Sequence, residues 1–126
     1  MNGNNILLDT NIILYLLSGD QTVADSLCKN HVYVSFVTEL ELLGYQGFES
    51  DEKLSVEGLI ADCTIIDINS DIKKGVIELR KSHKIKLPDA ILAATALSLN
   101  IPLMTSDKQL KKLKELNILF YDKSKS

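Results

Sequence analysis

Four acidic side chains stand where a folded chain of alternating strands and helices would gather carboxylates. Asp9 and Asp107 each follow a short apolar run, Glu41 lies in the first turns of a predicted helix, and Asp89 opens another helix. In open α/β sheets, ligands bind beyond the carboxyl ends of the strands. Connectivity alone therefore brings most of these four groups toward one edge of the predicted sheet.

Carboxylates that share one cleft repel each other, and burial raises their pKa values. Hard divalent cations relieve this repulsion, because Mg²⁺ and Mn²⁺ prefer oxygen ligands. A cation held in this way makes a nucleophile of water and neutralises charge on a phosphoryl group, and two cations about 4 Å apart hold both the attacking and the leaving oxygen. The sequence contains no nucleophilic Ser or Cys motif. The pattern therefore favours attack by water on a phosphodiester.

Each acid also has a purely structural interpretation. Asp9 could cap the helix that follows it, and Asp89, next to a proline, could complement the dipole of its own helix. Asp107 has the strongest such alternative, because Ser106 and Gln109 form an S-x-x-Q capping box that leaves Asp107 as an ordinary first-turn acid. An acid that closes an apolar strand needs a partner, so function is favoured for Asp9.

Two glutamates, Glu39 and Glu41, are candidates for the second acid of the set. Glu41 shares a helical stripe with Val37 and Gly44, whereas Glu39 shares another with Leu42. Helical spacing does not choose between the two glutamates.

The predicted elements alternate along the whole chain. Strands are expected over residues 5–9, 32–35, 64–68, 101–104 and 118–121, and helices over 11–17, 21–29, 37–45, 51–61, 70–84, 89–99 and 107–116. Strands separated by helices predict an α/β fold, with a mainly parallel sheet of four to five strands that is covered on both faces. The helix over 89–99 is apolar almost all round and is expected to be buried.

Length and composition predict one soluble domain over residues 1–126, with residues 122–126 as a flexible tail. The first residues lack the positive region of a signal peptide, and the apolar stretch 6–17 is too short and too polar to span a bilayer. A cytoplasmic location and no membrane contact are expected. Cys28 and Cys63 match no zinc or disulfide pattern, and they are expected to be reduced residues in or near the core.

Charge is distributed unevenly between the two halves of the chain. Residues 1–63 carry a net charge of -8 and residues 64–126 carry +5. Such asymmetry is typical of proteins that bind nucleic acid or an acidic partner, although solvated helix faces explain the lysines equally simply. Under the first interpretation, the RNA backbone contacts Lys81, Lys84, Lys86, Lys108 and Lys111.

Four segments resemble, in order, the motifs of PIN domains. They are LLDTNII (7–13), SFVTELEL (35–42), KLPDAILAATA (86–96) and LMTSD (103–107). In the second motif Ser, Thr and Glu recur at three-residue steps, which selects Glu41 over Glu39. Each motif alone is weak, but four in this order span residues 5–113 and are specific together. Length and the third motif resemble those of VapC-like toxins of toxin–antitoxin pairs.

This resemblance implies a three-layer α/β/α fold and Mg²⁺- or Mn²⁺-dependent cleavage of RNA. It also implies a homodimer and a small cognate antitoxin that covers the acidic site. Asp9, Glu41, Asp89 and Asp107 then correspond to catalytic metal ligands, and Asn11, Ser35 and Thr105 to supporting polar groups. Two departures stand out: Gln109-Leu110 replaces a common Asp-Phe pair, and Glu39 adds a carboxylate near the site.

Three other functional classes are compatible with parts of the pattern. A haloacid-dehalogenase-like phosphatase needs a second acid two residues after Asp9, where this chain has Asn11. A receiver-type signalling domain needs paired acids after the first strand and a phosphoacceptor that ends the third, and Asp67 lies inside the third strand instead. A catalytically inactive PIN-like RNA- or protein-binding module remains the main alternative, although the intact set of acids argues against it.

Overall fold

The computed structural model describes residues 4–125 and contains a five-stranded sheet in which every pair of neighbouring strands is parallel. The strands are β1 (Asn4–Leu8), β2 (Asn30–Ser35), β3 (Thr64–Ile66), β4 (Leu103–Thr105) and β5 (Ile118–Phe120). Their order in the sheet is β3-β2-β1-β4-β5, so β1 is central. The predicted parallel α/β fold is confirmed.

Strand side chains alternate between the two faces of the sheet, and both faces are buried. Ile6 and Leu8 of β1 belong to one hydrophobic cluster, whereas Leu7 between them belongs to the other. Leu103 and Met104 of β4 divide in the same way. A strand that is apolar at every position therefore reflects helices on both sides of the sheet rather than a helical segment.

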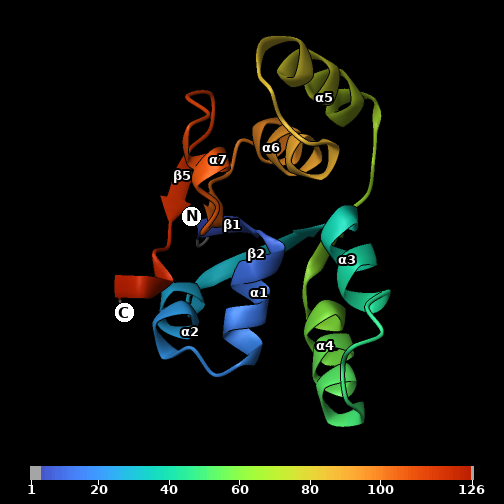
Figure 1. The fold of residues 1–126 in the computed structure, drawn as a ribbon, viewed down its shortest axis with the longest axis vertical. Coiled ribbons are helices and arrows are strands. Elements are labelled where there is room, and N and C mark those ends of the chain that lie inside the picture. The colour runs from blue at the N-terminus through green and yellow to red at the C-terminus, as the bar shows by residue number, and fades with distance from the viewer. Residues whose placement is uncertain (1–3, 126) are drawn as a thin grey trace.

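The helices form the two outer layers. They are α1 (Thr10–Leu17), α2 (Gln21–Leu27), α3 (Phe36–Leu43), α4 (Ser50–Asp62), α5 (Ser70–Ser82), α6 (Leu87–Leu99) and α7 (Lys108–Lys111), with a 3₁₀ turn at Lys123–Lys125. Buried residues of α1 to α4 pack in one cluster, and those of α5 to α7 pack in the other. Figure 1 shows α5 and α6 on one side of the strands and α1, α2 and α4 on the other.

Helix α6 is the buried helix that the sequence predicts. Every residue from Ala90 to Ala96 is buried, and Asn100 ends the helix in the left-handed conformation with φ 54°. Helix α5 covers α6 at close range, because a Cβ on Gly75 would lie 3.0 Å from the Cβ of Ala94. This packing fixes α6, and with it the first turn that carries Asp89.

One predicted helix is much shorter in the structure. The helix expected over 107–116 is only the four residues Lys108–Lys111. The twelve residues between β4 and β5 must also return the chain to the start of a parallel strand, so turns replace the rest of the helix. Within the segment predicted to be a flexible tail, Lys123 Nζ lies 2.7 Å from Asp20 Oδ2, while Ser126 is outside the described residues.

Two further findings concern membranes and cysteines. Within residues 4–125, no helix is long and apolar enough to cross a bilayer. Cys28 and Cys63 are both free thiols, as the sequence predicts. Cys28 is exposed, so the expectation that it lies in or near the core was wrong; it caps the end of α2, where the chain turns at the surface.

Candidate active site

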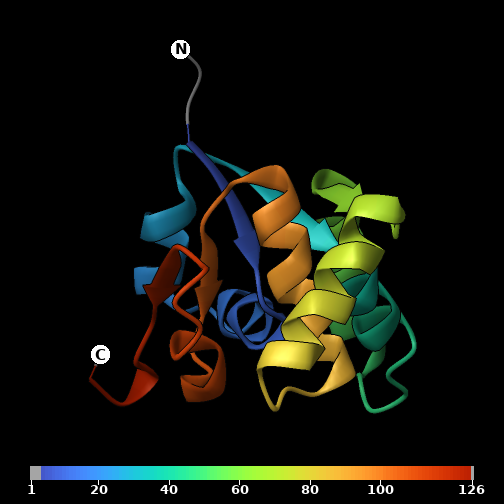
Figure 2. The same cartoon turned by 90° about the horizontal axis from the view of Figure 1, so that it is seen from above.

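The site lies at the point where the strand order of the sheet reverses. Connections from β1 lead to β2 on one side, and β4 pairs with β1 on the other. In open α/β sheets a crevice forms at such a point, beyond the carboxyl ends of the strands. Asp9 directly follows β1, and its N–H donates to Met104 O of β4 at 3.0 Å. Figure 2 shows that α6 begins and α7 lies at this same edge of the sheet.

All four predicted acids line one cleft at this edge. The cleft has a volume of about 220 Å³ and is hereafter called the acidic cleft. Its lining residues are Asp9, Thr10, Asn11, Glu41, Pro88, Asp89, Leu92 and Asp107. Glu39 is not among them, so of the two glutamates the structure brings only Glu41 to the other acids.

Asp9 is the most deeply placed of the four acids. Its side chain is 8% exposed, Thr105 Oγ1 donates to its Oδ2 at 2.6 Å, and the N–H of Thr10 donates to its Oδ1 at 2.7 Å. Burial raises its pKa, the two hydrogen bonds oppose this, and the charges of Asp107 and Glu41 raise it further. Asp9 is also the N-cap of α1, so its structural and functional interpretations are compatible.

Glu41 is exposed, but a threonine holds it in place. Thr10 Oγ1 donates to Glu41 Oε1 at 2.6 Å and lies 3.1 Å from the hydroxyl of the buried Thr38. Neither threonine was predicted as a supporting group. Thr38 precedes Glu41 by three residues, which places the two side chains on the same face of α3. That three-residue spacing is the feature of the sequence from which Thr38 could have been predicted.

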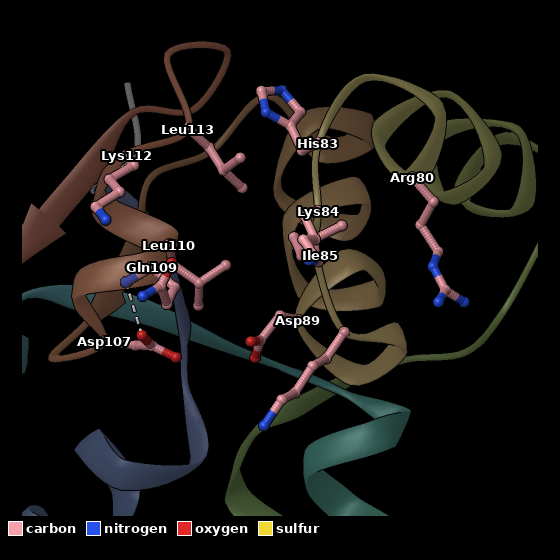
Figure 3. A pocket seen from close by; sticks show the side chains of 11 residues that line it. Arg80, His83, Lys84, Ile85, Asp89, Asp107, Gln109, Leu110, Lys112 and Leu113 are labelled. Atoms are coloured by element: carbon pink, nitrogen blue, oxygen red, sulfur yellow. Dashed lines mark hydrogen bonds between the residues drawn. The ribbon is translucent and has the colours of Figure 1, made fainter.

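Asp89 and Asp107 face each other from α6 and α7 (Figure 3). Asp89 lies in the first turn of α6 and is partly buried. Its pKa is raised to about 6, first by burial and then by the charges of Asp107 and Asp9, with a smaller contribution from Glu41; Lys86 opposes the rise. Asp89 is therefore the acid on which burial and the charges of the other three acids act together.

Asp107, rather than Ser106, caps α7. Its Oδ1 accepts from the N–H of Gln109 at 2.8 Å, and its own N–H donates to Thr105 Oγ1 at 3.0 Å. The predicted Ser106–Gln109 capping box is therefore wrong, because the helix begins one residue later than that box requires. Thr105 bonds to both Asp9 and Asp107, so a single hydroxyl links the acids that follow β1 and β4.

The other two predicted supporting residues occupy different places. Asn11 is exposed and lines the acidic cleft. Ser35 is fully buried, and its Oγ accepts from the N–H of Val37 at 3.2 Å as the N-cap of α3. Ser35 does not line the cleft; its contact is with the start of α3, the helix that carries Glu41.

A second, larger cleft adjoins the first (Figure 3). Its volume is about 790 Å³, and Asp89 and Asp107 line both clefts. Of the five lysines predicted to contact RNA, Lys84 and Lys86 line this second cleft, whereas Lys81, Lys108 and Lys111 do not. Two cations outside that predicted set, Arg80 and Lys112, also line it.

The chemistry of the donor set fits a hard divalent cation. The four charged groups of the acidic cleft are all carboxylates, and Mg²⁺ in proteins is bound through one or two carboxylates while it keeps several waters. Among residues 4–125, no three His, Cys, Asp or Glu side chains are close enough to hold an ion directly. The negative charge and oxygen chemistry of the cleft lining therefore fit such an ion.

Comparison with known proteins identifies the family. The model of the PIN domain matches residues 6–116. The chain belongs to the PIN domain family. The match extends from β1 to the turns after α7, and it includes all four acids of the acidic cleft.

Solved structures with the same fold come from toxin–antitoxin complexes. A chain of a toxin–antitoxin complex from Klebsiella pneumoniae is 28% identical, with a TM-score of 0.77 over 90% of this chain and 95% of that one. VapBC2 from Rickettsia felis, bound to a DNA fragment from its promoter, gives 20% identity and a TM-score of 0.82 over 94% and 99%. VapBC-1 from nontypeable Haemophilus influenzae gives 24% and 0.78 over 92% and 97%. No curated protein sequence matches the chain.

Family membership and these likenesses support three coarse conclusions. Membership supports nuclease activity, PIN nucleases generally use divalent metal ions, and the likenesses show that chains of this fold occur in complexes with antitoxins.

Proposed function

We propose that this PIN domain is a Mg²⁺- or Mn²⁺-dependent endoribonuclease, and that it is the toxin of a toxin–antitoxin pair. The observation that carries the proposal is the acidic cleft, where Asp9, Glu41, Asp89 and Asp107 converge at the switch point of the sheet. Burial, and after it repulsion from the neighbouring acids, raises the pKa values of Asp9 and Asp89, and a bound cation would relieve the repulsion.

Asp9, Glu41, Asp89 and Asp107 would hold the ion. When bound, Mg²⁺ or Mn²⁺ supplies Lewis-acid activation of water and neutralises charge on the phosphodiester. The protein's own contribution is to fix the oxygens before the ion arrives. Thr105 holds one oxygen of Asp9, and Thr10 holds one oxygen of Glu41. Because these oxygens are already in position, little free energy is needed to reorganise them during the reaction.

Cleavage of total bacterial RNA in Mg²⁺ or Mn²⁺ tests the nuclease. Wild type should cut, chelation with EDTA should stop it, and Asp89→Asn should abolish cleavage because it removes a ligand charge without changing side-chain size. Asp71→Asn is the matched control, since Asp71 is an exposed first-turn acid of α5 outside the acidic cleft. Cleavage by Asp89→Asn at the wild-type rate would overturn the site.

The toxin role has a separate test. Expression of the wild-type chain should arrest growth of a bacterial host, and expression of Asp9→Asn should not. Growth should resume when a small protein encoded next to the chain is expressed with it, as expected of an antitoxin that covers the acidic site. Sustained growth with active, uninhibited nuclease would contradict the toxin role while leaving the nuclease intact.

The homodimer and the cytoplasmic location follow from the same proposal. A protein that cuts bacterial RNA and binds an antitoxin made in the same cell would act in the cytoplasm. Sedimentation equilibrium should give about twice the chain mass of 14.0 kDa, and a monomer at all concentrations would remove the homodimer.

A further inference from the structure

A row of polar side chains on α3 leads from the interior of the protein to the acidic cleft. Ser35, Thr38 and Glu41 follow one another at three-residue steps, so each is a neighbour of the next on the helix surface. Ser35 and Thr38 are fully buried, whereas Glu41 is exposed and lines the cleft. Ser35 caps the start of α3, which accounts for its hydroxyl. The buried hydroxyl of Thr38 has no such capping function.

The hydroxyl of Thr38 bonds to a different element of the fold. Within residues 4–125 its one hydrogen-bond partner is the hydroxyl of Thr10, the first residue of α1, at 3.1 Å. A threonine inside a helix usually bonds to the carbonyl four residues earlier. Thr95 of α6 does so, because its equally buried hydroxyl donates to Ile91 O at 2.6 Å. Thr38 therefore differs from an ordinary buried helical threonine.

The number of protons fixes the direction of the bonds around Thr10. Thr10 Oγ1 lies 2.6 Å from Glu41 Oε1 and 3.1 Å from Thr38 Oγ1. A hydroxyl carries one proton, and an ionised carboxylate only accepts, so the proton of Thr10 goes to ionised Glu41. The second contact is then a hydrogen bond only if Thr38 donates to Thr10. The two bonds run from Thr38 through Thr10 to Glu41.

Thr10 needs this second contact because its side chain can rotate. Its N–H donates to Asp9 Oδ1 at 2.7 Å, so the main chain is tied to one acid while the hydroxyl is tied to another. Threonine in a helix populates two χ1 rotamers, and rotation about χ1 would carry the hydroxyl away from Glu41. A buried donor on the far side of the Thr10 oxygen favours the rotamer that faces Glu41.

We propose that Thr38 is a positioning residue for Glu41 and that it acts through the hydroxyl of Thr10. The proposal rests on the metal-dependent nuclease proposed above and deepens it. Thr38 does not line the acidic cleft, so it is a residue outside the cleft on which a candidate metal ligand depends. An exposed glutamate samples many rotamers, and fixing one when an ion binds costs conformational entropy. The two hydroxyls restrict Glu41 before the ion arrives.

Three variants separate the hydroxyl from the space that it fills. Thr38→Val removes the hydroxyl and keeps a β-branched side chain, and Thr38→Ser keeps the hydroxyl. Thr95→Val is the matched control, since it removes an equally buried hydroxyl that bonds to its own helix. If only the loss of a buried hydroxyl mattered, Thr38→Val and Thr95→Val would behave alike.

The first measurement needs no metal. In EDTA, three-bond NMR couplings to the γ-methyl carbon of Thr10 report the populations of its χ1 rotamers. Wild type, Thr38→Ser and Thr95→Val should each show one predominant rotamer, whereas Thr38→Val should show averaging between rotamers. A Thr10 rotamer that is unchanged in Thr38→Val would overturn the proposal.

Titration with Mn²⁺, followed by calorimetry, measures the effect on the site. Thr38→Val should bind Mn²⁺ roughly 3–10-fold more weakly, which is less than the 10–100-fold typical of a group that bonds directly to a metal ligand. Thr38→Ser should restore most of the affinity, and Thr95→Val should keep that of wild type. Equal losses in Thr38→Val and Thr95→Val would refute a specific contribution of Thr38.

A double-mutant cycle with Thr10→Val separates action through Thr10 from packing. If Thr38 acts through Thr10, Thr38→Val should cause no further loss of Mn²⁺ affinity in a chain that already carries Thr10→Val. Packing defects would add instead, because they do not depend on the Thr10 hydroxyl. The same loss in both backgrounds would contradict the proposal.

Failure of this inference and failure of the proposed function are distinguishable. The Thr10 rotamer is measured in EDTA, so averaging confined to Thr38→Val supports the chain of hydroxyls even in a protein that cuts no RNA. Metal-dependent cleavage by wild type, together with an unchanged Thr10 rotamer and unchanged Mn²⁺ affinity in Thr38→Val, would keep the nuclease and remove the role of Thr38.

Discussion

Replacing Asp89 by asparagine should stabilise the metal-free protein at neutral pH, although it should destroy the proposed activity. The carboxylate of Asp89 is partly buried and faces Asp107 and Asp9, and these neighbours and burial raise its pKa to about 6. The charged form is therefore less favourable in the folded chain than in the unfolded one. Asparagine has the same size and no charge, so it removes this cost.

The size of the stability gain expected for Asp89→Asn follows from the pKa of Asp89. A rise from 3.8 to about 6 corresponds to about 3 kcal/mol, at roughly 1.4 kcal/mol per pKa unit. Asp89 is half-buried, so solvent screening reduces the stabilisation expected from asparagine to about 1–2 kcal/mol. The variant also loses a favourable charge at the helix N-terminus, which lowers its stability by ~0.5 kcal/mol. The net gain is about 1 kcal/mol, which raises the Tm of a 126-residue domain by about 4 °C.

The pH dependence has a definite sign. Below about pH 4 Asp89 is protonated in the folded state, so wild type and Asp89→Asn should be equally stable there. As the pH rises through about 6 the folded carboxyl ionises and wild type loses stability relative to the variant. The difference in Tm should therefore grow from near zero at pH 4 to its full size at pH 7.5.

Differential scanning calorimetry in EDTA measures this difference, and Asp71→Asn serves as the control. Asp71 is an exposed acid in the first turn of α5, so its replacement should bring no gain at any pH. Adding Mn²⁺ should then raise the Tm of wild type but not that of Asp89→Asn. An Asp89→Asn protein that is no more stable than Asp71→Asn at pH 7.5 would refute the electrostatic reasoning about the acidic cleft.

Three further predictions concern groups around and beyond the site. Thr105→Val should lower the Tm at pH 7 by roughly 6–10 °C, because the 2.6 Å hydrogen bond to buried Asp9 is worth about 1.5–3 kcal/mol; calorimetry that shows no loss would contradict this. Thr10→Val should weaken metal affinity or RNA cleavage by about 10–100-fold because Glu41 loses its 2.6 Å hydrogen bond, and unchanged Mn²⁺ titration and cleavage would be the contrary result. Asp20→Asn should be less stable than wild type at pH 7, because hydrogen bonds from Lys123 and Tyr121 lower the pKa of Asp20 to about 2 in the folded protein. This difference in stability should vanish as an acid titration approaches pH 2, and a difference that persists below pH 2 would show another cause.

The sequence predicted the elements of the fold because local patterns encode them. The apolar run Ile6–Leu8 within the predicted strand 5–9 indicates a strand buried on both faces, and the apolar helix that ends at Leu99 is predicted to be central. The order of strands and helices then predicts a parallel sheet, and the carboxyl ends of parallel strands share one edge. For the same reason Asp9, Asp89 and Asp107 could be named from their places after strands and at helix starts, whereas the resemblance to the second PIN motif was needed to choose Glu41 over Glu39.

The resemblance had named Thr105 as a supporting group, but tertiary structure alone showed which acid each polar group bonds to and added Thr10. The bonds from Thr10 to Glu41 and from Thr105 to Asp9 join residues 31 and 96 positions apart. No periodicity within one element reports such a contact, because it depends on how β1, α3 and β4 meet. The short α7 was equally hidden, since its length is set by the return of the chain to β5 rather than by its own helix-forming residues.

The basic residues show most clearly where sequence information ends. Composition located an excess of positive charge in the second half of the chain, but it did not show that Arg80 and Lys112 line the larger cleft whereas Lys81 and Lys111 do not. Adjacent residues on a helix or turn point in different directions, and only the packing of α5 and α7 around one cleft determines which of them faces it. Charge is a property of the sequence, whereas the surface that carries it is a property of the fold.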